Sequence, residues 1–448
     1  MAQPEPVLAF ARQRKVWHLA APIILALSSQ NLMNLVDTAM VGTLGKTALA
    51  GVGFAGMMLW AVVAVFQGLS PAVQTQTARR LGEGDSARLH QSMVNSLYLA
   101  VGFGIPYTWL LFTSAAPLFH FFNDDPAVCT LGGEYFQIRA LSLVFMGVNF
   151  GFRGFFNGIK KPNLYMQTLL MMHPINILLN YLLIFGIAGL PRLETNGAAL
   201  GTLIATILGT LNYIRLFLKH REPGATLHWK AVDLGGMKSL LRQAIPNCFQ
   251  SFSLALGFML YFVIAGKIST DALAATSVLI RLALLCTLIG LGFGIATLTL
   301  VGHAVGEGQP DEARRWVHTA LFMTCTTLTL IGACFALFPA FFLDWFIQEP
   351  AVIHIALTPM VLMGLSQSYD AAAIVLMHAH LGGGSARRVL VISFVNQWLL
   401  FLPASYAAVT WGGFDLTGLW VCMISYRFLL FLTFVASLTQ GNWIRAQV

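Results

Sequence analysis

The chain has 448 residues, of which 57% are hydrophobic and only 10% are charged. Soluble domains typically carry about 25% charged residues, so this composition excludes a cytosolic enzyme, a secreted disulfide scaffold and a disordered protein, and indicates a polytopic membrane protein. The net charge of +8 does not indicate a nucleic-acid-binding protein, because the basic residues lie in short clusters between apolar runs.

Apolar runs long enough to cross a bilayer recur along the whole chain. A spanning helix needs roughly 20 mostly apolar residues. The first run continues to Met40, which is too long for the apolar part of a signal peptide. We therefore predict an all-α polytopic membrane protein with twelve transmembrane helices, at approximately 16–41, 48–77, 91–115, 130–152, 164–187, 196–218, 239–265, 272–301, 316–338, 352–376, 388–410 and 416–440.

The basic residues predict the orientation of these helices. Alternate loops, beginning with the N-terminus and including the adjoining helix ends, contain 19 Lys and Arg residues, whereas the opposite loops contain only Lys46, Arg192 and Lys267. Basic residues concentrate in cytoplasmic loops. We expect both termini to be cytoplasmic, in a bacterial-type inner membrane.

Residues in the first half of the chain match residues in the second half at a constant separation in sequence. This separation equals half of the total length, and we call it the half-length offset. The matches need no gap from Pro22 to Gly158, which indicates an internal duplication. The matching pairs are Pro22 with Pro246, Gly42 with Gly266, Ala48-Leu49-Ala50 with Ala272-Leu273-Ala274, Gly68 with Gly292, Gly82-Glu83-Gly84 with Gly306-Glu307-Gly308, and Gly158 with Gly382.

An even number of helices in each half means that both halves begin on the same side of the membrane. We predict an N-lobe of residues 1–220 and a C-lobe of residues 221–448, related by a pseudo-two-fold axis along the membrane normal and joined by a linker around 219–238. Two parallel lobes with a substrate site between them are a known transporter design that suits alternating access.

Asp37 is an intramembrane carboxylate that the duplication does not repeat, since Tyr261 occupies the matching position. Charged groups inside a bilayer are costly and are functional candidates by default. Asn180 and Thr202 lie about 10 Å from the outer ends of their helices, close to the depth of Asp37, and Asn176 lies one turn below Asn180. We predict that these four residues form one polar cluster that accepts a proton or a small hard cation.

Two further features of the helices bear on function. Pro22 lies fifteen residues before Asp37 and permits a bend in the first helix. Asp370 is a second intramembrane carboxylate, for which Arg281 is the expected partner; a structural ion pair and a second coupling site both remain open.

Aromatic and methionine side chains suit varied flat cations. We therefore select Met33, Asn34, Phe54, Phe150 and Met172 as candidates for a substrate cavity.

The features above resemble the multidrug and toxic compound extrusion (MATE) transporters over nearly the whole chain. The proline-to-aspartate spacing and the single N-lobe carboxylate are similar to the branch named for the DNA-damage-inducible F protein. The resemblance implies export of amphipathic, often cationic drugs driven by inward H⁺ or Na⁺. It also implies a cation site at Asp37, Asn176, Asn180 and Thr202, with Pro22 at the bend. The residues that carry the resemblance are Pro22, Asn34-Leu35-Val36-Asp37-Thr38, and the loops Gly82-Glu83-Gly84 and Gly306-Glu307-Gly308.

Some members of that family carry a second aspartate where Asn180 stands here. One charge fewer weakens a Na⁺ site and favours H⁺. We therefore expect a proton-coupled multidrug antiporter that is not an enzyme, functions as a monomer in the lipid bilayer, and uses no cofactor and no metal beyond a possible Na⁺. The alternative function is a flippase of lipid-linked saccharides or other lipids, which would line its cavity with several basic residues.

Overall fold

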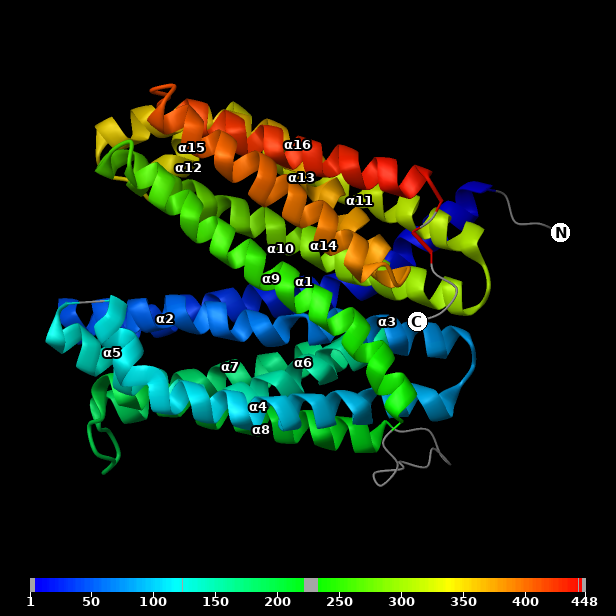
Figure 1. Cartoon of the computed structure of the whole chain (residues 1–448), viewed down its shortest axis with the longest axis horizontal. Coiled ribbons are helices and arrows are strands. Elements are labelled where there is room, and N and C mark those ends of the chain that lie inside the picture. The colour runs from blue at the N-terminus through cyan, green and yellow to red at the C-terminus, as the bar shows by residue number, and fades with distance from the viewer. Residues whose placement is uncertain (1–4, 123, 221–232, 442, 445–448) are drawn as a thin grey trace. The chain divides into compact units, whose positions relative to one another are not determined.

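The computed structural model describes residues 5–122, 124–220, 233–441 and 443–444. Within these ranges the regular elements are all helical (Figure 1). The first half contains α1 (Glu5–Gly42), α2 (Lys46–Gln67), α3 (Leu69–Gly82), α4 (Ser86–Phe122), α5 (Pro126–Ala140), α6 (Leu143–Gly158), α7 (Pro162–Phe185) and α8 (Glu194–Lys219). The second half contains α9 (Leu234–Gly266), α10 (Thr270–Gly306), α11 (Pro310–Leu337), α12 (Pro339–Asp344), α13 (Pro350–Gly382), α14 (Ala386–Phe394), the π-helix η1 (Val395–Phe401), α15 (Leu402–Thr410) and α16 (Leu416–Thr439). Most of the expected linker, residues 221–232, lies outside the described residues.

Eleven helical segments of the described chain are long and apolar enough to cross a membrane. The all-α polytopic fold class is therefore confirmed. The fourth predicted span, 130–152, is divided between α5 and α6, each of which is too short to cross a bilayer alone. The interruption lies at Leu141 and Ser142, between the end of α5 at Ala140 and the start of α6 at Leu143. The Ser142 hydroxyl donates to the carbonyl oxygen of Arg139 at 2.6 Å, but its repeat counterpart Ser366 makes the same kind of bond to Met363 inside the unbroken α13, so this bond alone does not divide the helix.

The helix boundaries repeat at the half-length offset. The first helix of each half ends at Gly42 or Gly266, and the next begins at Lys46 or Thr270. The turns repeat as well, because Gly84 and Gly308 both have a φ of 72°. Left-handed backbone of this kind favours glycine. Equal boundaries and equal turns support the predicted duplication.

The π-helix marks a place where the two copies differ. The segment α14–η1–α15 runs over 25 residues, Ala386–Thr410, whereas its counterpart α7 has 24. A π-helical turn spans one residue more than an α-helical turn. The additional residue of the second copy is accommodated at η1.

The chain divides into two compact units, which we describe separately. The N-unit is Leu25–Cys248, and the C-unit is the described part of Met1–Ile24 together with that of Phe249–Val448. These units differ from the predicted lobes 1–220 and 221–448 in two segments. The first part of α1 belongs to the C-unit, and the first part of α9 belongs to the N-unit. The exchange points, Ile24 and Cys248, are again related by the half-length offset, and each follows the helix proline by two residues.

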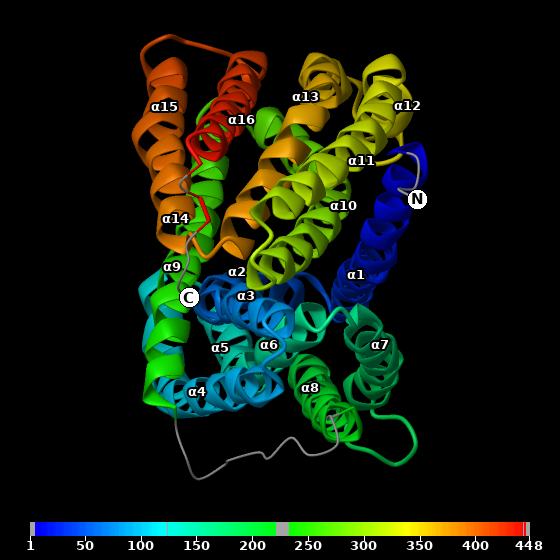
Figure 2. The same ribbon diagram turned by 90° about the vertical axis from the view of Figure 1, so that its right-hand side faces the viewer.

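Within each unit, neighbouring helices pack side by side. In the N-unit α7 packs on α8, as Figure 2 shows. The short helix α5 packs on α2, α4 and α8. In the C-unit α13 packs on α10, α11 and α16. The N-unit also contains the second part of α1, so it holds all three helices that carry the predicted coupling residues, α1, α7 and α8.

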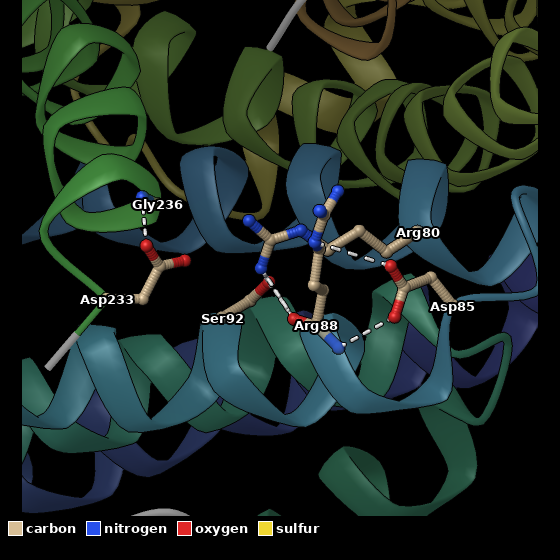
Figure 3. A network of polar contacts seen from close by, with 6 residues as sticks. All are labelled: Arg80, Asp85, Arg88, Ser92, Asp233 and Gly236. Carbon is tan, nitrogen blue, oxygen red and sulfur yellow. Dashed lines mark hydrogen bonds and ion pairs between the residues drawn. The ribbon is translucent and has the colours of Figure 1, made fainter. Parts of the chain in front are cut away.

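Polar contacts hold the start of α9 against α4 within the N-unit. Figure 3 shows the bond between Asp233 and Gly236 at the start of α9 and, apart from it, the contacts among Arg80, Asp85, Arg88 and Ser92 on α3, α4 and the turn between them. Asp233 accepts a hydrogen bond from the backbone N–H of Gly236 at 3.0 Å, and its own carbonyl accepts one from Asn95 on α4 at 3.4 Å. Arg80 on α3 donates to the hydroxyl of Ser92 on α4. The beginning of α9 thus lies against polar groups of α4, which α3 in turn supports.

The first part of α1 is held in the C-unit in a similar manner. Arg12 makes a two-pronged contact with Glu312 on α11, at 3.2 and 3.3 Å. The ammonium group of Lys15 lies 5.9 Å from the ring centroid of Trp316, also on α11. Both units therefore include a helix segment from the opposite half of the sequence.

Candidate ion-coupling site

Asp37 lies on α1, five residues before the helix ends at Gly42, and is half-buried. The side-chain amide nitrogen of Asn180, on α7, donates a hydrogen bond to Asp37 Oδ1 at 2.8 Å. A carboxylate at membrane depth needs such a donor, because no bulk water solvates it there. The bond joins α1 to α7 within the N-unit.

The hydrogen bonds continue from Asn180 to α8. Asn180 donates to Asn176 Oδ1 at 3.4 Å, and Asn176 donates to the hydroxyl of Thr202 at 3.1 Å. Asn176 and Asn180 are fully buried, and Thr202 is 8% exposed. The structure therefore brings together the four residues that the sequence analysis grouped by depth.

The amide of Asn176 has a second favourable orientation, in which its nitrogen and oxygen exchange places. The nitrogen then donates to Asp37 Oδ1 at 3.1 Å, and the oxygen accepts from the backbone N–H and the hydroxyl of Thr202 at 3.3 and 3.1 Å. In this orientation two amide N–H groups point at the same carboxylate oxygen. Donors stabilise an ionised carboxylate but cannot ligate a metal ion.

Gly201 gives the amide of Asn180 its place between α7 and α8. A Cβ atom at Gly201 would overlap with Asn180 Oδ1 and would lie 3.0 Å from the backbone nitrogen of the same residue. Only a residue without a side chain permits this approach. The sequence analysis did not identify Gly201, although its position directly before Thr202 is the signal that could have done so.

Further polar groups lie near the cluster, and the sequence had not indicated that Gln30 and Arg139 are among them. Gln30 of α1 lies 3.3 Å from the Nε2 atom of His173 on α7, which makes a second polar contact between these helices. The charge of Arg139, on α5, acts on both Asp37 and Tyr135. Arg139 thus contributes positive potential to the surroundings of the carboxylate.

Three of the five candidates for a substrate cavity are partly buried and pack against the hydrophobic clusters of the N-unit. Phe54 makes an edge-on contact with Phe119 at 5.1 Å, and the Arg153 guanidinium lies 4.9 Å from the centroid of Phe150. Met172 packs against a cluster of buried residues. Their assignment to a cavity remains a prediction.

The other two candidates lie on α1. Met33 is buried, whereas Asn34 is exposed and accepts a hydrogen bond from Gln30 at 3.3 Å. The assignment of Met33 and Asn34 to a substrate cavity also remains a prediction.

The structure corrects the expected partner of Asp370. Arg281 is exposed on α10, and the ion pair is made instead by Arg427 of α16, whose Nη1 lies 2.9 Å from Asp370 Oδ1. Arg427 is 57 residues from Asp370 in sequence, and only the packing of α13 on α16 brings them together. Asp370 is thus one half of an internal ion pair.

The donor set of the Asp37 cluster contains one carboxylate, two amides and one hydroxyl. Among the described residues, no group of three or more His, Cys, Asp and Glu side chains is placed to hold a metal ion. A hard cation such as Na⁺ would have to use carboxylate, amide and hydroxyl oxygens. The arrangement of N–H donors around Asp37 suits a carboxylate that gains and loses a proton.

The MatE family model matches residues 22–182 and again residues 246–407. The two matches begin at Pro22 and Pro246, the two prolines of the duplication. The second match is one residue longer than the first, in agreement with the additional residue at η1. Together they cover more than half of the chain.

Related proteins match almost end to end. The probable multidrug resistance protein NorM of Thermotoga maritima is 24% identical over 97% of this chain and 94% of its own length. The protein of the same name from Rhodopseudomonas palustris is 28% identical over 86% of this chain and 82% of its own length.

Solved structures share the fold at low sequence identity. A MOP superfamily transporter from Pyrococcus furiosus has a TM-score of 0.89 at 20% identity, with 98% of each chain covered. An outward-facing multidrug resistance MATE family transporter has a TM-score of 0.88 at 19% identity, also with 98% of each chain covered.

Proposed function

Because the chain belongs to the MatE family, whose members are transporters and not enzymes, we propose that it is a secondary active multidrug exporter that exchanges amphipathic, often cationic compounds for protons. The relatives named as probable multidrug resistance proteins support this substrate class. The observation that carries the coupling proposal is the hydrogen bond between Asp37 and Asn180 inside a membrane span.

Asp37 is the proton acceptor in this proposal. When the carboxylate is ionised, the amides of Asn180 and Asn176 stabilise its charge through N–H donors. When it is protonated, the charge is lost, those bonds weaken, and α1 is released from α7. A transport cycle by alternating access then couples the proton at Asp37 to a rearrangement of α1 near Pro22 and to release of the drug outside.

A proton suits this site better than Na⁺. The site contains one carboxylate, which is enough to bind a proton, whereas a hard metal cation needs several oxygen ligands. Na⁺ would also need the side-chain amide oxygens as ligands. The oxygen of Asn176 already accepts a hydrogen bond from Asn180 or, when the amide of Asn176 is turned over, the two hydrogen bonds from Thr202. Both effects favour H⁺ as the coupling ion.

The test is transport of the cationic dye ethidium in inverted membrane vesicles under an imposed pH gradient, with and without Na⁺. We expect gradient-driven dye uptake that needs no Na⁺, since inverted vesicles accumulate an exported compound. Asp37→Asn should abolish nearly all of this uptake without reducing the amount of inserted protein. The control is Asp311→Asn, at an exposed carboxylate beside the start of α11, which should transport as the wild type does.

Normal dye uptake by the Asp37→Asn variant would contradict the proposal. Uptake that follows a Na⁺ gradient and ignores pH would replace the proton by Na⁺. If the vesicles transport no dye but translocate a lipid-linked saccharide, the alternative flippase function is correct.

A further inference from the structure

The ion pair between Asp370 and Arg427 lies inside the C-unit, on helices α13 and α16 that both count as membrane spans. The two side chains are only 14% and 19% exposed, and their charged atoms are 2.9 Å apart. A charge pair withdrawn from water in this way is strongly attracted, since the surrounding dielectric constant is low. The pair is therefore a lasting feature of the C-unit.

Aromatic rings complete the surroundings of the guanidinium. Its central carbon lies 5.7 Å from the ring centroid of Phe258 and 5.6 Å from that of Tyr426. Tyr426 in turn stacks on Phe401 at 4.6 Å. One carboxylate and two aromatic faces form a receptor for an organic cation, and here the cation belongs to the protein itself.

The duplication shows how the two units differ at this place. At the half-length offset, Tyr261 stands where the first half has Asp37. Tyr261 and Tyr426 both lie against Phe401, with Tyr261 at 5.5 Å. The position that holds the coupling carboxylate in the N-unit thus holds an aromatic ring in the C-unit, and Phe401 joins this ring to Tyr426 beside Arg427.

We propose that Arg427 is a tethered cation that permanently fills the cation-accepting position at Asp370 and so prevents the C-unit from exchanging ions. A covalently attached cation competes with free cations at a very high effective concentration. Removal of its side chain leaves a space bounded by the Asp370 carboxylate and by the rings of Phe258 and Tyr426, which accepts a free cation of the guanidinium class. Arg427 therefore determines that coupling is confined to the N-unit.

The first test measures binding of methylguanidinium to the purified full chain by thermal unfolding in detergent. We expect no saturable response of the wild type, and a saturable rise of about 2 °C or more in the Tm of Arg427→Ala. Arg427→Ala loses one partner of a buried pair, so it is purified in the presence of methylguanidinium, which is then removed. Arg427→Gln gives the same test if the alanine variant does not fold.

Three controls separate this site from general effects of the salt. Arg281→Ala removes an exposed arginine of the same unit and should give no saturable response. Arg427→Lys keeps a tethered cation, and the double variant Asp370→Asn with Arg427→Ala removes the acceptor, so both should also give none. An equal response of the wild type, no response of the folded Arg427→Ala or Arg427→Gln variant, or a persistent response of the double variant would overturn the inference.

The second test rests on the proposed function. The double variant Asp370→Asn with Arg427→Gln removes both charges, and we expect it to keep at least half of the proton-driven ethidium transport. Loss of that transport by the folded double variant would show that Asp370 takes part in coupling and would overturn the inference. If the wild type itself does not transport, the proposed function fails, whereas the methylguanidinium experiment still decides the role of Arg427.

Discussion

At Gly201, a single missing side chain sets the distance between α8 and the Asn180 amide. The amide cannot simply turn away from a larger residue, because its nitrogen is bonded to Asp37. Any group added at position 201 therefore forces either the helices or the Asp37 bond to yield. The geometry of the coupling cluster depends on this residue as much as on its own members.

Gly201→Ala should reduce the free energy of unfolding by about 1–3 kcal/mol, as expected for overpacking of a close contact. It should also reduce proton-driven transport, because the amide of Asn180 is displaced. The measurement is the Tm in detergent together with dye uptake. The control, Gly102→Ala on α4, places a methyl group in open space and should leave both unchanged. Equal behaviour of the two variants would contradict this account.

Asn180→Asp should convert the cluster into a better site for Na⁺. A second carboxylate beside Asp37 adds a charged oxygen ligand, and the repulsion between the two carboxylates is relieved by a bound cation. We expect Na⁺ to stimulate ethidium transport by the variant at least threefold and the wild type hardly at all. The matched control is Asn212→Asp, on the neighbouring helix α8. Stimulation of that variant by Na⁺ would contradict the assignment of a Na⁺ site to the Asp37 cluster.

The members of the Asp37 cluster could be predicted because the depth of a residue follows from its distance to the helix end. Asp37, Asn180 and Thr202 needed nothing more than the constant rise of a helix. The partner of Asp370 could not be predicted in the same way. The depth of Arg281 made it plausible, but which arginine faces α13 depends on helix rotation and packing.

The π-helix η1 is the element in which the second repeat departs from the first. Three consecutive residues of η1 bond to other helices: Asn396 to Thr433, Gln397 to the carbonyl of Leu254, and Trp398 to Ser253. The wider turn of the π-helix holds these three side chains in place, and the faces by which α14 and α15 pack on other helices stay in register with those of α7. The additional residue is thus confined to one turn.

Deletion of Leu399, which is exposed in η1, should convert the π-turn into α-helix and leave the protein folded. Deletion of Leu178, equally exposed but in the regular helix α7, should rotate Asn180 away from Asp37 by about 100°. Size-exclusion chromatography and the Tm measure folding. We expect a monodisperse Leu399 deletion and an aggregated or inactive Leu178 deletion, and the reverse order would refute the assignment of η1 as the place of the additional residue.

At the scale of the whole molecule, the basic residues predict which loops face the cytoplasm. Cysteine at Glu83, an exposed residue between α3 and α4, should react with a membrane-impermeant maleimide in inverted vesicles but not in intact cells. Cysteine at Asp124, exposed between α4 and α5, should show the opposite pattern. The unmodified chain gives the background of its native cysteines. Labelling of both positions from the same side would contradict the predicted topology.

The sequence was sufficient to predict the number of repeats and the offset between them, because glycines and prolines mark helix ends and turns in both copies. It was not sufficient to predict the division of 130–152, since a long apolar run carries no signal for an interruption at Leu141 and Ser142. The exchange of the first parts of α1 and α9 between units was also missed. Contacts such as that of Arg12 with Glu312 join residues 300 apart and leave no periodic signal.

The exchange of helix segments has a consequence for the order of folding during synthesis. The N-unit requires residues up to Cys248, so it cannot be completed when the first repeat leaves the ribosome. The C-unit, in turn, needs the beginning of α1, which is made first and must wait for α11 to bind Arg12 and Lys15. We therefore expect that neither repeat folds as an independent unit when it is made without the other.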